Sequence, residues 1–127
     1  MQLTVVHDKE IRLDVDGQHS LALEGNTWGA LPMLAASLAV CTTAVLREYA
    51  ATSQFTLEPF SIMVRWRMAE RPRRVDRLDV RLVLRPHVPP SRYDALLRAA
   101  EQCPVHQTLA HGIEINSAWE VHGAQQA

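Results

Sequence analysis

The stretch "LPMLAASLAVCTTAVLREYA", residues 31–50, decides the fold of this chain. It predicts a long helix over roughly residues 31–51, after a loop in "GNTWGALP" (25–32). The apolar residues of this helix point around most of its circumference: Leu34, Leu38, Val40, Val45, Leu46 and Tyr49. A helix that is apolar on all sides must be buried on all sides. One small sheet in a 127-residue chain can hardly enclose it, so we expect a second subunit, most simply in a symmetric homodimer.

Alternating apolar and polar residues predict strands on both sides of the helix. Those before it are residues 2–7, 10–15 and 19–24, with a hairpin turn at Asp16-Gly17. Those after it are residues 60–68, 77–84 and 113–121. A second helix is expected after Pro89-Pro90, ahead of the last strand. The predicted order is β-β-β-α-β-β-α-β, an α+β fold in one domain over residues 1–127.

The composition excludes several classes of protein. A formal net charge of −1 gives no overall electrostatic signal for nucleic acid or an anionic membrane. The N-terminus lacks the pattern of a secretory signal, and the apolar run at 30–46 is shorter than the ~20 residues of a spanning helix. Two cysteines and scattered histidines do not have the spacing of a zinc site. We therefore expect a cytoplasmic protein with no nucleic-acid partner, no membrane partner and no bound metal.

The two cysteines carry the candidate chemistry, in different settings. Pro104 is expected to end the second helix and to begin a new helical turn over residues 104–110, with Cys103 at its N-cap. Unpaired amide groups and the helix dipole lower the pKa of a thiol there. Cys41 lies mid-helix among small residues, so its activation requires a positive group or a hydrogen-bond donor from elsewhere in the fold or from a partner chain. Either cysteine taken alone also fits a small buried hydrophobe.

Histidines and arginines near these cysteines have simpler interpretations. His106 and His111 are five residues apart, a poor helical spacing for a shared metal, and we interpret them as surface or capping groups. The strand arginines are expected on a solvated sheet face with Asp79, with one of them leaning towards Cys41 as the alternative: Arg65, Arg67 and Arg81.

Two segments about sixty residues apart resemble one family: residues 31–50, quoted above, and "AAEQCPVHQTLAHGIEI" (99–115). They are similar to the OsmC/Ohr family, the osmotically inducible protein C and organic hydroperoxide resistance proteins, over residues 26–121. The resemblance implies intertwined homodimers of α+β subunits, a long buried central helix and active sites at the dimer interface. It also implies that Cys41 is the peroxidatic cysteine and Cys103 the resolving one.

The chemistry that the resemblance implies is thiol-dependent reduction of organic hydroperoxides in the oxidative stress response. The Cys41 thiolate attacks the O–O bond and releases an alcohol. The resulting sulfenic acid condenses with Cys103 to a disulfide, which a cellular dithiol reduces, so no bound cofactor is expected. An apolar pocket at the interface favours organic peroxides over hydrogen peroxide.

The sequence departs from the family pattern at the groups that activate the peroxidatic thiol. Relatives use a glutamate after the proline at the start of the long helix, together with an arginine of an N-terminal loop. Here Met33 follows Pro32, and Arg12, the only arginine of the N-terminal region, falls in a predicted strand. Glu48 lies on the Cys41 face and is interpreted as solvated.

Two other functions stay open for so divergent a member. One is a dimeric binding protein whose interface pocket holds an apolar small molecule, with the cysteines vestigial or redox-sensing. The other is a structural scaffold with two buried thiols.

Overall fold

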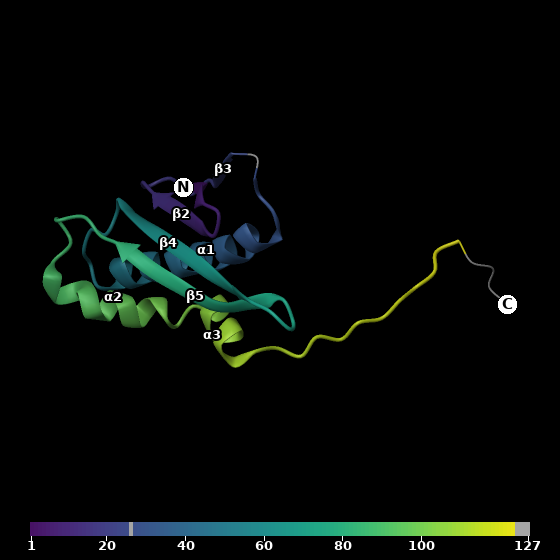
Figure 1. Ribbon diagram of the computed structural model, residues 1–127. Coiled ribbons are helices and arrows are strands. Elements are labelled where there is room, and N and C mark those ends of the chain that lie inside the picture. The colour runs from purple at the N-terminus through teal and green to yellow at the C-terminus, as the bar shows by residue number, and fades with distance from the viewer. Residues whose placement is uncertain (26, 124–127) are drawn as a thin grey trace.

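The long helix α1 spans Ala30–Thr52, within one residue of its predicted bounds. The structure is a computed structural model and describes residues 1–25 and 27–123. It confirms the mixed α+β class, with α1 lying across one face of a sheet (Figure 1).

The sheet has five strands in the order β3-β1-β2-β4-β5. The strands are β1 (Gln2–His7), β2 (Glu10–Val15), β3 (Ala22–Glu24), β4 (Phe60–Ala69) and β5 (Arg74–Val83). Only β3 runs parallel to its neighbour, and the remaining pairs are antiparallel. The two predicted strands at residues 2–7 and 10–15 match β1 and β2 residue for residue. The run predicted at 19–24 is shortened to three residues. It pairs with β1 and not with β2, so the hairpin predicted at Asp16-Gly17 is wrong.

The alternation in β4 sets the register of the core. Ile62 pairs with Leu13 on one side and with Leu82 on the other. Ile62 and Leu13 are fully buried, whereas Leu82, on β5, is only half-buried. The apolar side chains on this face of the sheet therefore become more exposed towards β5. In the described part of the chain β5 pairs with β4 alone, so its other edge is free.

One side of α1 supplies the other half of the core. Its buried residues are Ala35, Ala36, Leu38, Ala39, Thr42, Thr43, Leu46 and Ala50. The buried hydroxyls of Thr42 and Thr43 donate hydrogen bonds to the carbonyl oxygens of Leu38 (2.8 Å) and Ala39 (3.0 Å), which offsets the cost of burying them. By length and composition alone α1 could cross a membrane, a test that the core helix of a soluble protein also passes. Its packing against β2 and β4 marks it as the core helix.

The single subunit does not bury α1 on all sides. Met33, Ser37, Ala44 and Glu48 are exposed along its opposite side. The prediction of an all-round buried helix is therefore not met within one chain, and covering this side would require another polypeptide.

Three short helices follow the sheet: η1 (Pro90–Arg92), α2 (Tyr93–Ala100) and α3 (Pro104–His111). Both α2 and α3 pack against α1. The predicted turn at residues 104–110 is thus a helix of its own, which begins at Pro104 and ends before Gly112 (φ 77°). Glycine reaches this positive φ without the steric penalty of a side chain.

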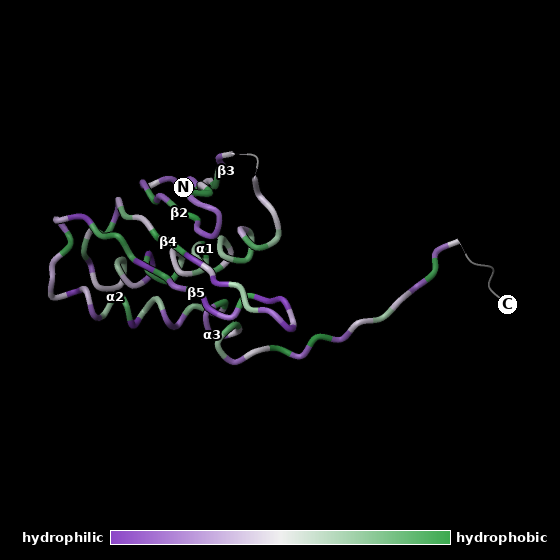
Figure 2. The backbone as a smooth tube through the Cα atoms, viewed as in Figure 1, coloured by the Kyte–Doolittle hydropathy of each residue, from purple (hydrophilic) through white to green (hydrophobic). Residues whose placement is uncertain are grey.

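The prediction of a last strand over residues 113–121 is wrong for the single subunit. The chain is extended there but forms no ladder, and it leaves α3 in a direction away from the sheet (Figure 1). Apolar and polar residues alternate along it (Figure 2). Its large apolar side chains are exposed: Ile113, Ile115, Trp119 and Val121. Residues 113–121 therefore have the pattern of a strand, but no backbone among the described residues pairs with them.

Candidate active site

Cys41 lies on the side of α1 that faces α3. Leu34, Leu38 and Cys41 are spaced i, i+4 and i+7, which places them on one face of the helix. Cys41 is half-buried, and Leu38 one turn before it is buried. The thiol is therefore partly sheltered from water by the core and still open on one side.

Cys103 is fully buried and is the N-cap of α3, as its position before Pro104 predicted. Its Sγ accepts a hydrogen bond from the backbone N–H of His106 at 3.3 Å. Pro104 has no N–H, so the open amide groups of the first turn belong to the residues that follow it. The sequence therefore places this sulfur at the positive end of the helix dipole.

The structure brings the two cysteines together at the N-terminus of α3. The Cys103 thiol and the backbone N–H of Val105 both lie close enough to the Cys41 thiol to shift its pKa. Both thiols are free. Two residues 62 positions apart in the sequence thus share one helix end, because α3 packs against α1.

Burial is the main influence on the Cys41 thiol and raises its pKa above the ordinary value of 9.0. The hydrogen bond with Cys103 and the charge of that thiol raise the pKa further, whereas the Val105 N–H lowers it. Among the residues that the structure describes, no cationic side chain influences the pKa of Cys41. In one subunit the thiol therefore keeps its proton at neutral pH.

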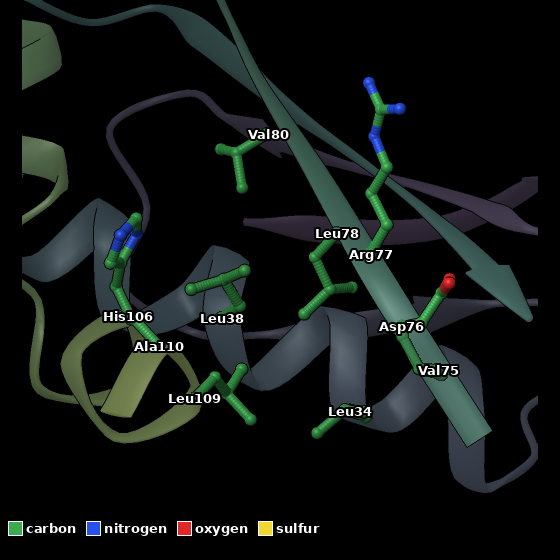
Figure 3. Close-up of a pocket in the computed structure, with 10 residues that line it drawn as sticks. All are labelled: Leu34, Leu38, Val75, Asp76, Arg77, Leu78, Val80, His106, Leu109 and Ala110. Atoms are coloured by element: carbon green, nitrogen blue, oxygen red, sulfur yellow. The ribbon is translucent and has the colours of Figure 1, made fainter. Parts of the chain in front are cut away.

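A groove lies between α1, β5 and α3 (Figure 3), and its lining includes Leu38, one turn before Cys41, but neither cysteine. It has a volume of about 290 Å³. Leucine and valine side chains from the three elements line it: Leu34, Leu38, Leu78, Val80 and Leu109. Arg77 and Asp76 lie at its edge, and the Arg77 side chain points away from the leucines (Figure 3). The groove suits an apolar ligand of small-molecule size.

His106 is a functional candidate that the sequence interpretation missed. Instead of lying on the surface, its half-buried side chain lines the groove beside Leu38 (Figure 3). The helical spacing could have identified His106, because Leu109 and Ala110 at i+3 and i+4 share its helix face and line the same groove. His111 is the capping group that was predicted, with Nδ1 2.9 Å from the Gln107 carbonyl oxygen.

None of the charged residues considered as activators of Cys41 is directed at its sulfur in the described part of the chain. Arg12 forms an ion pair with Asp14 at 3.0 Å within β2, and Glu48 is exposed. The strand arginines lie on the face of the sheet opposite α1, as predicted, but Asp79 forms its ion pair with Arg77 instead. Their partners are Glu10 for Arg65 (3.4 Å), Asp76 for Arg67 (2.9 Å) and the Met63 sulfur for Arg81 (3.3 Å).

The fold and the site define a class of protein: an α+β subunit in which two free cysteines meet at a helix N-terminus beside an apolar groove. The chain belongs to the OsmC-like protein family, whose model matches residues 24–118. This confirms the resemblance stated from the two cysteine segments.

Two solved structures are similar to this one in fold. One is an OsmC-like hydroperoxide resistance protein from Jannaschia sp. CCS1, with a TM-score of 0.62 and 19% identity over 94% of this chain and 90% of that one. The other is from Psychrobacter arcticus 273-4, a candidate osmotic stress induced and detoxification response protein, with a TM-score of 0.60 and 19% identity over 84% of each chain. At this level of identity the likeness shows the fold alone. Comparison with curated protein sequences gives no match.

Proposed function

We propose that this chain is a thiol-dependent hydroperoxide reductase that acts on organic hydroperoxides. The observation that carries the proposal is the meeting of Cys41 and Cys103 at one helix N-terminus. The OsmC-like family and the name of the Jannaschia relative support peroxides as the substrate. The apolar groove supports an organic substrate over hydrogen peroxide.

The proposed reaction has three steps. The Cys41 sulfur attacks the outer peroxide oxygen, the O–O bond breaks, and the organic fragment leaves as an alcohol. The Cys41 sulfenic acid then reacts with the Cys103 thiol, which forms the disulfide and releases water. A dithiol of the cytoplasm finally reduces this disulfide by thiol exchange, so the cycle needs an external reductant and no bound cofactor.

The setting of Cys103 suits the resolving step. A thiol attacks as the thiolate, and a helix N-terminus favours negative charge on sulfur. Because Cys103 is buried close to Cys41, it can reach the sulfenic acid before a second peroxide does. The helix N-terminus would also stabilise Cys103 as the leaving thiolate when the disulfide is reduced.

We further propose that the working unit is a homodimer in which residues 113–121 of one subunit pair with the free edge of β5 in the other. The exposed apolar side chains of this segment need cover, and its alternating pattern is that of a strand. An unpaired strand edge such as that of β5 is a template for pairing with a further strand. The added strand would wall the open side of the groove and exclude water from it.

Charge complementarity supports this pairing. The polar face of the segment carries Glu114 and Glu120, whereas the outer face of β5 is net positive, with Asp79 between Arg77 and Arg81. Glutamates and arginines on neighbouring strands of one face attract each other. The opposite face of the segment would then place Trp119 towards the helices and the groove.

One observation favours a second candidate function, a peroxide sensor of slow turnover. The pKa of Cys41 is raised, and a protonated thiol reacts slowly. A sensor would form the same disulfide but would not consume peroxide repeatedly.

The experiment measures consumption of cumene hydroperoxide with dihydrolipoamide as the reductant. Wild-type protein should turn over many equivalents, and Cys41→Ser should consume none above background. A single turnover per subunit would favour the sensor. Equal slow consumption by both proteins would contradict both functions.

A further inference from the structure

Cys103 has a structural task besides its proposed reaction, because its sulfur caps the helix α3. The Sγ atom accepts the backbone N–H of His106 at 3.3 Å. The first turn of α3, residues 104–107, holds no acidic side chain that would stabilise this helix end in its place. An isolated helix of eight residues is marginal in water, so α3 depends on its cap and on its packing.

The packing of α3 is concentrated at the same end as the cap. Cys103 is fully buried, and the half-buried Val105 packs against the core. No residue of α3 itself is buried, and Thr108 to His111 are all exposed. The helix is therefore anchored to the body of the subunit at its N-terminal end, and a change at Cys103 affects its only firm attachment.

The other cysteine of the pair has a fixed position. Cys41 lies in the middle of the 23-residue α1, between the buried residues Ala39, Thr42 and Thr43. Both thiols are free, and a disulfide would bring the two sulfurs closer than two free thiols can approach. Because a protein yields most easily where few residues are buried, the movement falls on Cys103 and α3.

We propose that Cys103 is a redox-sensitive helix cap, an inference that rests on the cysteine chemistry of the proposed function. In the reduced protein its sulfur holds the first turn of α3. An organic hydroperoxide then takes two electrons and two hydrogen atoms from the two thiols and leaves as an alcohol and water. One S–S bond replaces the two S–H bonds, the Cys103 sulfur leaves the His106 N–H, and α3 loosens from its first turn onwards.

The loosening reaches two features that α3 carries. Leu109 and Ala110 line the groove, and residues 113–121 leave the helix directly after Gly112. A loosened α3 therefore opens one wall of the groove and gives a reductant access to the disulfide. Because the cap stabilises the reduced form alone, the same coupling favours the return of the disulfide to the two thiols.

The test compares amide hydrogen exchange, followed residue by residue by NMR, in the reduced full-length protein and in its disulfide form. Diamide forms the disulfide, since it oxidises neighbouring thiols without any need for peroxidase activity. Two variants separate the cap from the cross-link. Cys103→Ser keeps a capping oxygen but can form no disulfide, whereas Cys103→Ala has neither. Cys41→Ser keeps the cap and controls for other effects of diamide.

Oxidation of the wild type should speed amide exchange at residues 106–111 by roughly 3- to 30-fold, the effect of losing a helix N-cap. The amides of β4 should keep their protection. Reduced Cys103→Ala should show the same loss in α3, and reduced Cys103→Ser should match the reduced wild type. Diamide should leave the exchange of Cys41→Ser unchanged.

Three outcomes would overturn the inference. If the disulfide forms and α3 keeps or gains protection, Cys103 is no switch, while the reductase function stands. If Cys103→Ala exchanges like the reduced wild type, the sulfur contributes nothing as a cap and the inference fails in the same way. If diamide joins no Cys41 to Cys103, the proposed function fails first and takes this inference with it.

Discussion

Replacing Trp119 by alanine tests the proposed strand exchange between subunits. Trp119 is 87% exposed in the single subunit, the most exposed of its large apolar side chains. Burying an indole removes on the order of 200 Å² from water, which is worth about 5 kcal/mol at ~25 cal/mol per Å². Alanine retains part of this area, so each truncation should cost about 2–4 kcal/mol.

The loss occurs twice in a symmetric dimer, because each subunit contributes one segment. The dimerisation free energy should therefore fall by about 4–8 kcal/mol, which weakens Kd by roughly 10³-fold or more. Sedimentation equilibrium over a dilution series measures this directly. Asn116→Ala is the matched control, since Asn116 lies on the polar face of the same segment and should change Kd by less than about tenfold.

The reasoning fails if Trp119→Ala and Asn116→Ala dimerise as tightly as the wild type. It also fails if the wild type is a monomer at micromolar concentration, because residues 113–121 would then be covered by something other than a second subunit. In either case residues 113–121 would not form the sixth strand of a neighbouring sheet.

Three further predictions follow from the site and the core. Cys103→Ser should still be oxidised at Cys41 but should accumulate sulfenic and then sulfinic acid, detected as mass increases of one and two oxygen atoms; lasting protection of Cys41 would count against a resolving function. Because the pKa of Cys41 is raised from 9.0 and the thiolate is the nucleophile, its alkylation rate in the reduced protein should still climb above that pH; a plateau near neutral pH would contradict the assignment. Ile62→Ala should lower the free energy of unfolding by about 2–5 kcal/mol in urea denaturation, whereas Met63→Ala, on the opposite face of β4, should cost much less, and equal losses would refute the assigned register.

The helix and the central strands could be predicted because their patterns are local. The alternation in residues 60–68 needs only a sheet with one buried face, and β4 meets that condition with Phe60 to Trp66 buried at every second position. The N-cap position of Cys103 is equally local, because Pro104 defines the start of α3.

The partner of each local feature was harder to foresee. Residues 113–121 have a strand pattern, but a pattern does not say which backbone completes the ladder. His106 was misassigned because its burial depends on how α3 packs against α1 and β5, a contact between distant parts of the chain. The separation of Cys41 and Cys103 in the sequence does not give the distance between them in the fold. Their proximity was therefore predicted from the family resemblance.

Mass spectrometry of the reduced protein after one equivalent of cumene hydroperoxide tests the central claim most directly. The account predicts a subunit lighter by two hydrogen atoms, with a peptide in which Cys41 is joined to Cys103. A protein whose mass and free-thiol count stay unchanged, with Cys41 still open to alkylation, would contradict it.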